Sequence, residues 1–160
     1  MTAGEPDFAI LVVAAGRSVA DRLGEAVRDA GGERMRPSFG FVLRAVAAER
    51  PTVSRLAALL GVTKQAASRL ADDMVELGFL ERAADPDDRR RTRLELSARG
   101  ERVRARALAE SHAMEAELRE RFGAAAVDHL RAALVDFVER HGGAEELRAQ
   151  RARMTEEPAR

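Results

Sequence analysis

The strongest constraint on the fold lies in residues 52–70, where two short segments with helical apolar spacing are separated by Gly61. This pattern predicts two helices that cross closely. The glycine is free to take the positive φ of a tight turn, and Ala57 supplies a small side chain at the crossing. The residues expected to fill the space between the helices are Leu56, Leu60, Val62, Ala67 and Leu70. The segment is therefore predicted to form a helix-turn-helix.

The second of these helices, residues 64–77, is predicted to have one polar half and one apolar half. At about 100° per residue, its polar side chains fall within one half-circle, and these are Lys64, Gln65, Ser68, Arg69, Asp72, Asp73 and Glu76. We expect the preceding Thr63 to cap the helix N-terminus. An ordinary solvated surface is the simplest role for such a face, and its acidic pair favours that interpretation locally.

The N-terminal end of the same face has side chains that can form hydrogen bonds, which suits contact with base edges in the major groove of duplex DNA. We therefore predict that Gln65, Ser68 and Arg69 contact bases. Thr63 and Lys64 are expected to lie nearer to phosphates. The two aspartates would repel phosphate, so we expect them where the helix leaves the groove.

An arginine-rich hairpin is predicted directly after these helices. Residues 79–84 and 92–97 have the composition of short strands, and the Pro and Asp cluster between them marks a turn. Four arginines lie in or beside this turn, namely Arg89, Arg90, Arg91 and Arg93. A basic loop beside a polar helix is an arrangement suited to binding DNA.

Asp88 and Arg90 occupy alternate positions at the hairpin tip, so their side chains project to the same side. A charge-assisted hydrogen bond between them would hold the Arg90 guanidinium extended for entry into a narrow minor groove. Arg89 and Arg91 could then contact phosphates on either side. The alternative is a solvated basic loop whose arginines pair with the nearby aspartates.

Helical periodicity continues on both sides of this region. Apolar residues recur at intervals of three and four over residues 7–30, over residues 98–121 and beyond Gly123, and a shorter helix is expected from Pro37 to about Ala48. A lone winged domain cannot cover all the apolar stripes of the terminal helices, so these stripes predict a homodimer. The expected fold class is mainly α (α+β), a winged helix-turn-helix domain with long N- and C-terminal dimerisation helices.

We expect a single domain over residues 1–160. Its predicted parts are a DNA-binding lobe at residues 34–100, a helical dimerisation lobe formed by residues 7–31 and 101–141, and a polar tail at residues 142–160.

Composition excludes several mechanisms. The chain has no cysteine, so disulfides and thiolate metal sites are impossible, and a reducing cytoplasm is the expected location. The apolar run over residues 8–15 is far too short to span a bilayer, so no membrane partner is expected. The net charge is zero, but residues 34–106 carry +6 while the segments before and after carry −3 each. Phosphate responds to this local field rather than to the total.

No catalytic constellation is evident. The chain has no Gly-rich phosphate loop, no nucleophile elbow and no Ser-His-Asp spacing, so we expect a protein that is not an enzyme. Glu110, His112 and Glu115 could offer a pair of metal ligands on one helix face, but a third ligand is not visible. We therefore predict no catalytic residues, no metal site and no cofactor.

The residues described above resemble the MarR family of winged-helix transcriptional regulators. The resemblance runs in register from about residue 37 to residue 100. It is carried by Leu-Gly-Val-Thr-Lys-Gln-Ala-Ala-Ser-Arg-Leu at 60–70, Leu-Gly-Phe-Leu-Glu-Arg at 77–82 and Asp-Pro-Asp-Asp-Arg-Arg at 85–90. The most specific element is an Asp-x-Arg at 88–90 that is followed by Leu-Ser-x-x-Gly at 96–100.

The resemblance implies a homodimer whose interface is formed by the first helix and the last two, with Arg90 in the minor groove. It also implies a small aromatic or phenolic effector in some members. In this chain such a ligand would draw on Arg17, Phe39, Phe41 and His112, on helices expected to meet at the junction of the lobes. The chain lacks Tyr and Trp, which argues against a stacking pocket of the usual kind.

The function expected from the sequence is a sequence-specific transcriptional regulator, a repressor that binds double-stranded DNA as a homodimer on an inverted repeat and that a small molecule could control. The competing hypothesis is a winged-helix module whose basic face binds an acidic partner protein. Salt dependence separates the two, because DNA binding releases condensed counterions.

Overall fold

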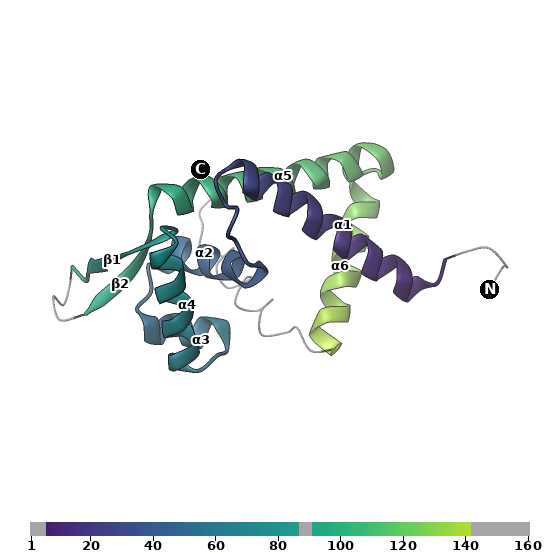
Figure 1. The fold of residues 1–160 in the computed structure, drawn as a ribbon. Coiled ribbons are helices and arrows are strands. Elements are labelled where there is room, and N and C mark those ends of the chain that lie inside the picture. The colour runs from purple at the N-terminus through teal and green to yellow at the C-terminus, as the bar shows by residue number, and fades with distance from the viewer. Residues whose placement is uncertain (1–5, 87–90, 142–160) are drawn as a thin grey trace.

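A computed structural model describes residues 6–86 and 91–141 (Figure 1). The chain folds mainly into helices, with one small antiparallel hairpin in which Leu80 pairs with Leu96. In chain order the elements are α1 (Phe8–Asp29), α2 (Pro37–Glu49), α3 (Val53–Leu60), α4 (Lys64–Glu76), β1 (Leu80–Ala84), β2 (Thr92–Leu96), α5 (Ala98–Phe122) and α6 (Ala124–His141). The predicted fold class is confirmed, because this is the architecture of a winged helix with long terminal helices.

The elements form two groups that α5 connects. The helices α2, α3 and α4 lie together with the β1–β2 hairpin on one side, and α1 and α6 lie on the other (Figure 1). The first half of α5 packs on the winged group, and the helix continues along α1 before the chain turns into α6. We refer to the β1–β2 hairpin as the wing.

The core lies within the winged group and is built around two aromatic rings. Phe39 of α2 and Phe79, just before β1, are fully buried, and their rings meet edge to face with centroids 6.4 Å apart. Further fully buried side chains surround them: Val42, Val46, Leu56, Met74, Leu80, Leu94 and Val103. Every element of the winged group and the start of α5 therefore contributes to one core.

The crossing of α3 and α4 follows the predicted pattern with one exception. Gly61 ends α3 in the left-handed conformation, at φ 65°. Ala57 is 6% exposed, and Leu56 and Ala67 are fully buried. Val62, which we predicted between the helices, is instead 42% exposed, because it occupies the turn after Gly61 rather than a helix.

The start of α5 is locked to the end of the α4 segment. The Ser97 hydroxyl accepts a hydrogen bond from the N–H of Gly100 at 3.0 Å and donates one to the carbonyl of Gly78 at 2.6 Å. A Cβ at Gly100 would lie only 2.1 Å from the Phe79 carbonyl oxygen, so no larger residue fits there without moving the backbone. The Leu-Ser-x-x-Gly motif therefore sets how closely α5 approaches the core.

Charged side chains join α1 to α5. The Arg22 guanidinium donates to Glu110 at 2.6 Å and to Glu117 at 2.7 Å. These hydrogen bonds hold the pKa of both glutamates below the ordinary value and raise the pKa of Arg22. Arg106 also donates to Glu110, at 3.1 Å.

The terminal helices expose many large apolar side chains. Phe8, Ile10 and Val13 of α1 are 63–71% exposed, and Leu130 and Phe137 of α6 are about half exposed. Exposed apolar side chains in this number are unusual for a monomeric protein. Within residues 6–86 and 91–141, no helix has the combination of length and apolar character needed to cross a bilayer.

The α3–α4 crossing yields a stability prediction. Ala57→Leu should lower the free energy of unfolding by about 1–3 kcal/mol, because the added atoms overpack a close helix contact. Ala58→Leu is the matched control. Ala58 is the next residue on α3, its side chain is exposed, and leucine is a good helix former. Urea unfolding followed by circular dichroism measures both, and equal stability of the two variants would contradict the described crossing.

The Arg22 pairs yield a pH prediction. Carboxylates whose pKa is lowered by folding stabilise the folded state above their unfolded pKa, and this stabilisation disappears as pH falls through the folded pKa. The free energy of unfolding should therefore fall as the pH is lowered from 7 to about 3, mostly below about pH 5, and Arg22→Met should lower it at pH 7 and reduce the difference between pH 7 and pH 3. Arg17→Met, an exposed change on the same helix, is the control. An unchanged pH difference in Arg22→Met would refute the role of these pairs.

Candidate nucleic-acid interface

The N-terminus of α4 is held by a side-chain cap. The Thr63 hydroxyl accepts a hydrogen bond from the N–H of Ala66 at 3.2 Å, which confirms the predicted cap. The Thr52 hydroxyl caps α3 in the same way, because it accepts a hydrogen bond from the N–H of Arg55 at 3.3 Å. The two caps begin both helices of the helix-turn-helix at defined residues, and the first turn of α4 is thereby presented in a fixed conformation.

The predicted contact residues of α4 lie on its surface. Lys64, Gln65 and Arg69 are exposed, and in the described part of the chain their side chains have no hydrogen-bond or ion-pair partner. Ser68 is half-buried, and its hydroxyl lies 3.4 Å from a carboxylate oxygen of Asp72. Gln65 and Arg69 are one turn apart, so they extend from neighbouring positions of one face.

The two aspartates of α4 each pair with an arginine from another element. Arg82 of β1 donates to Asp72 at 2.5 Å, and Arg36, which precedes α2, donates to Asp73 at 3.0 Å. Both pairs are exposed, so each contributes little to stability. Their importance is electrostatic: they offset the negative charge that made this half of α4 unfavourable for contact with phosphate.

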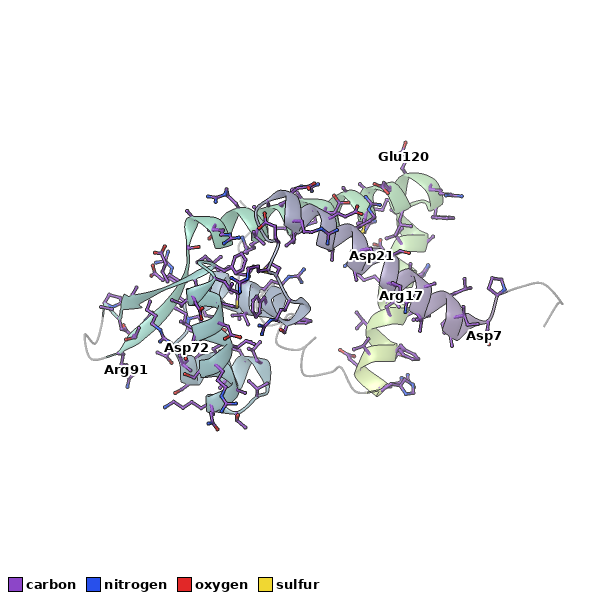
Figure 2. The ribbon with its side chains drawn as sticks, viewed as in Figure 1. Asp7, Arg17, Asp21, Asp72, Arg91 and Glu120 are labelled. Atoms are coloured by element: carbon purple, nitrogen blue, oxygen red, sulfur yellow. The ribbon has the colours of Figure 1, made fainter. Side chains whose placement is uncertain are left out.

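The wing lies beside α4. Figure 2 shows Asp72 on the side of α4 nearest the wing, and Arg91 at the distal end of β2. The Asp72–Arg82 pair therefore connects the helix to a wing strand. The wing is also joined to the chain before α3, because the N–H of Leu94 donates to the Pro51 carbonyl at 2.9 Å.

Arg93 is held within the wing. Arg93 donates to the buried carboxylate of Asp85 at 2.8 Å. For this residue the structure therefore shows the alternative that we considered, in which hairpin arginines pair with nearby aspartates. Arg91 is exposed, and its carbonyl accepts from the N–H of Asp85. Asp88, Arg89 and Arg90 lie outside the described residues, so their roles stay predictions.

The four predicted effector residues occupy different environments. Phe39 is fully buried against Phe79 and is a core residue, whereas Phe41 on the same helix is 48% exposed. Arg17 on α1 borders a shallow hollow with Ala9, Ile10, Val13 and Ala14, and His112 is exposed on α5.

In the part of the chain that the structure describes, no cluster of His, Asp or Glu could hold a metal ion.

Two helices that cross at a glycine turn, followed by a two-stranded wing, define the winged-helix class of DNA-binding domains. Residues 41–91 match the family model of the MarR family. The matched segment therefore belongs to the MarR family of transcriptional regulators, and the family assignment made from the sequence is confirmed. No curated protein sequence gives a significant match to the chain.

Solved structures of similar fold include the MepR–DNA complex of S. aureus, with a TM-score of 0.65, 18% identity, and coverage of 83% of this chain and 96% of that one. RV1404 from Mycobacterium tuberculosis has a TM-score of 0.65 and 23% identity, with coverage of 89% and 99%. CouR from Rhodococcus jostii RHA1, bound to p-coumaroyl-CoA, has a TM-score of 0.60 and 25% identity, with coverage of 86% and 95%.

Sequence reasoning missed Arg36 and Arg82 as partners of the α4 aspartates. No local signal identifies them, because they lie 37 and 10 residues from their partners in the chain. Only the tertiary arrangement brings these guanidinium groups to α4.

The exposed face of α4 yields a prediction about DNA recognition. Gln65→Ala and Arg69→Ala should each cost about 1–3 kcal/mol of binding free energy at particular base positions and should relax specificity there. Glu76→Ala, on the same half of α4 but far from its N-terminus, is the control. The measurement is competition binding against operators with single base changes. Equal losses on specific and random DNA would overturn the assignment of Gln65 and Arg69 as base contacts.

Proposed function

We propose that this protein is a sequence-specific transcriptional regulator that binds an inverted repeat as a homodimer and represses transcription by occluding a promoter. The observation that carries the proposal is the N-terminal face of α4, where Lys64, Gln65 and Arg69 are exposed and without protein partners in the described residues. Groups of this kind at the start of a recognition helix match the donors and acceptors of base edges and phosphates.

The wing completes the proposed contact. Arg91 is exposed beside the hairpin tip, and we retain the predicted roles of Arg90 in the minor groove and of Asp88 as its orienting partner. Arg89 and Arg91 are assigned to flanking phosphates. On α4, Thr63 and Ser68 complete the set of residues that we propose contact DNA. The similar fold of MepR, which was solved bound to DNA, supports this use of the fold.

The homodimer is supported by the apolar side chains that α1 and α6 expose. Phe8, Ile10 and Phe137 would be costly to leave in water, and a second copy of the chain offers the same apolar helices for mutual burial. A two-fold arrangement can place two recognition helices about one DNA turn apart, at ~34 Å. This geometry explains why the proposed operator is an inverted repeat.

Control by a small molecule is the remaining part of the proposal. CouR, whose structure contains p-coumaroyl-CoA, supports an aromatic acyl ligand as the first compound to test. Arg17, Phe41 and His112 are exposed and can contact a ligand as they stand. Phe39 would have to leave the core, so we assign it a structural role.

The proposal is tested by titrating duplexes that the protein itself selects from a random pool, at several salt concentrations. Affinity should fall steeply between about 50 and 200 mM salt, and light scattering at micromolar concentration should give the mass of a dimer. The same titration with added p-coumaroyl-CoA tests the effector, and weaker DNA binding is expected.

Three outcomes would count against separate parts of the proposal. A monomer at micromolar concentration would contradict the homodimer. Binding to duplex DNA that is weak and insensitive to salt would favour the alternative of a module for an acidic protein partner. Unchanged affinity and melting temperature with the acyl-CoA and with a set of aromatic acids would indicate a regulator that acts without such a ligand.

A further inference from the structure

Arg99, the second residue of α5, contacts four residues in two separate parts of the chain through one side chain, namely the segment after α1 and the segment between α4 and β1. Its Nε donates to the Gly31 carbonyl at 2.7 Å, and one terminal nitrogen donates to the Leu77 carbonyl at 2.9 Å. The other terminal nitrogen pairs with Glu33 at 3.2 Å. The guanidinium carbon lies 4.7 Å from the centroid of the Phe79 ring, so the cation also stacks on a core aromatic.

The two carbonyls belong to the C-terminal ends of two different helices. Leu77 is the C-cap residue of α4, and Gly31 directly follows Ala30, the C-cap residue of α1. Carbonyls at a helix C-terminus lack partners within the helix and carry the negative end of its dipole, so a cation stabilises them. One guanidinium therefore binds the C-cap carbonyl of α4 and the first carbonyl beyond the C-cap of α1 at the same time.

The position of Arg99 in its own helix strengthens this interpretation. It lies in the first turn of α5, where the positive end of the helix dipole disfavours a cation. The charge is therefore placed against the preference of its own helix, and the contacts with the ends of α1 and α4 compensate. Lysine could not replace it fully, because a single ammonium cannot direct donors to three acceptors as a planar fork does.

Helix α1 packs on α5, whereas α4 packs on α3 and β1. The Arg99 side chain thus connects a helix of the proposed dimer interface with the helix of the proposed DNA contact. We propose that Arg99 is a positioning residue that fixes the orientation of α4 relative to α1. Through that orientation it sets the half-site spacing that the dimer accepts. The spacing part of this inference rests on the proposed function, but the orientation part does not.

The orientation is tested without DNA. The absence of cysteine allows spin labels at Asp21→Cys on α1 and Ala58→Cys on α3, both exposed positions outside the Arg99 contacts. Labelled chains are diluted with excess unlabelled chain so that the measured distance is within one chain. Arg99→Met should broaden the distance distribution, and Arg99→Lys should broaden it less. Arg102→Met, an exposed arginine one turn along α5, should leave it unchanged.

The spacing is tested with the selected operator after one base pair is inserted into or removed from its centre. The protein with Arg99 should lose about tenfold or more in affinity for the altered operators, and Arg99→Met should lose clearly less. Reduced stability alone would weaken binding to every operator by the same factor. A smaller dependence of affinity on half-site spacing in Arg99→Met therefore separates positioning from a merely structural role.

The inference would be overturned if the distance distributions of Arg99→Met and Arg99→Lys were as narrow as that of the parent protein, whatever the stability of the two variants. A broadened distribution with an unchanged spacing profile would overturn the link from orientation to operator choice. If the parent protein itself showed no preferred spacing, the proposed function would fail, while the distance measurement would still decide the role of Arg99 within the chain.

Discussion

The arrangement of this protein depends on close contact at Phe79. Its ring lies in the core with the edge of Phe39 on one side and the Arg99 guanidinium over its face. Its carbonyl accepts from the N–H of Ser97 at 3.1 Å and leaves no room for a side chain at Gly100. The end of the α4 segment, the first strand of the wing and the start of α5 therefore meet at one residue. The position of the wing and the direction of α5 both follow from this contact.

The regular parts of the fold could be predicted because they depend on local patterns. Thr63 and Gly61 mark the ends of helices through their own chemistry, and strong apolar periodicity placed the six helices of the described residues to within a few residues. Val62 shows where this reasoning fails, since an apolar residue in a turn need not follow the helical pattern that surrounds it. Phe39 shows the same limit for function, because an aromatic residue can belong to a core or to a pocket, and only packing distinguishes them.

The long-range contacts could not be predicted for a different reason. Arginines are numerous in this chain, and the sequence does not distinguish Arg99 or Arg82, which bridge separate elements, from Arg102, which contacts solvent. A guanidinium reaches several ångströms from its backbone, so its partner depends on how whole helices are placed. The motif around Ser97 and Gly100 was visible in the sequence, but the arginine between them acquired its role only from tertiary structure.

The pairing of the two α4 aspartates has a consequence for how related regulators can diverge. Arg36 and Arg82 lie outside the helix whose charge they balance. Loss of either arginine would leave a carboxylate without its counterion and make the local potential more negative, although every residue of α4 stayed the same. Two proteins with identical recognition helices could thus differ in their attraction to nucleic acid, and evolution could adjust affinity at these outlying positions without rewriting the base preference.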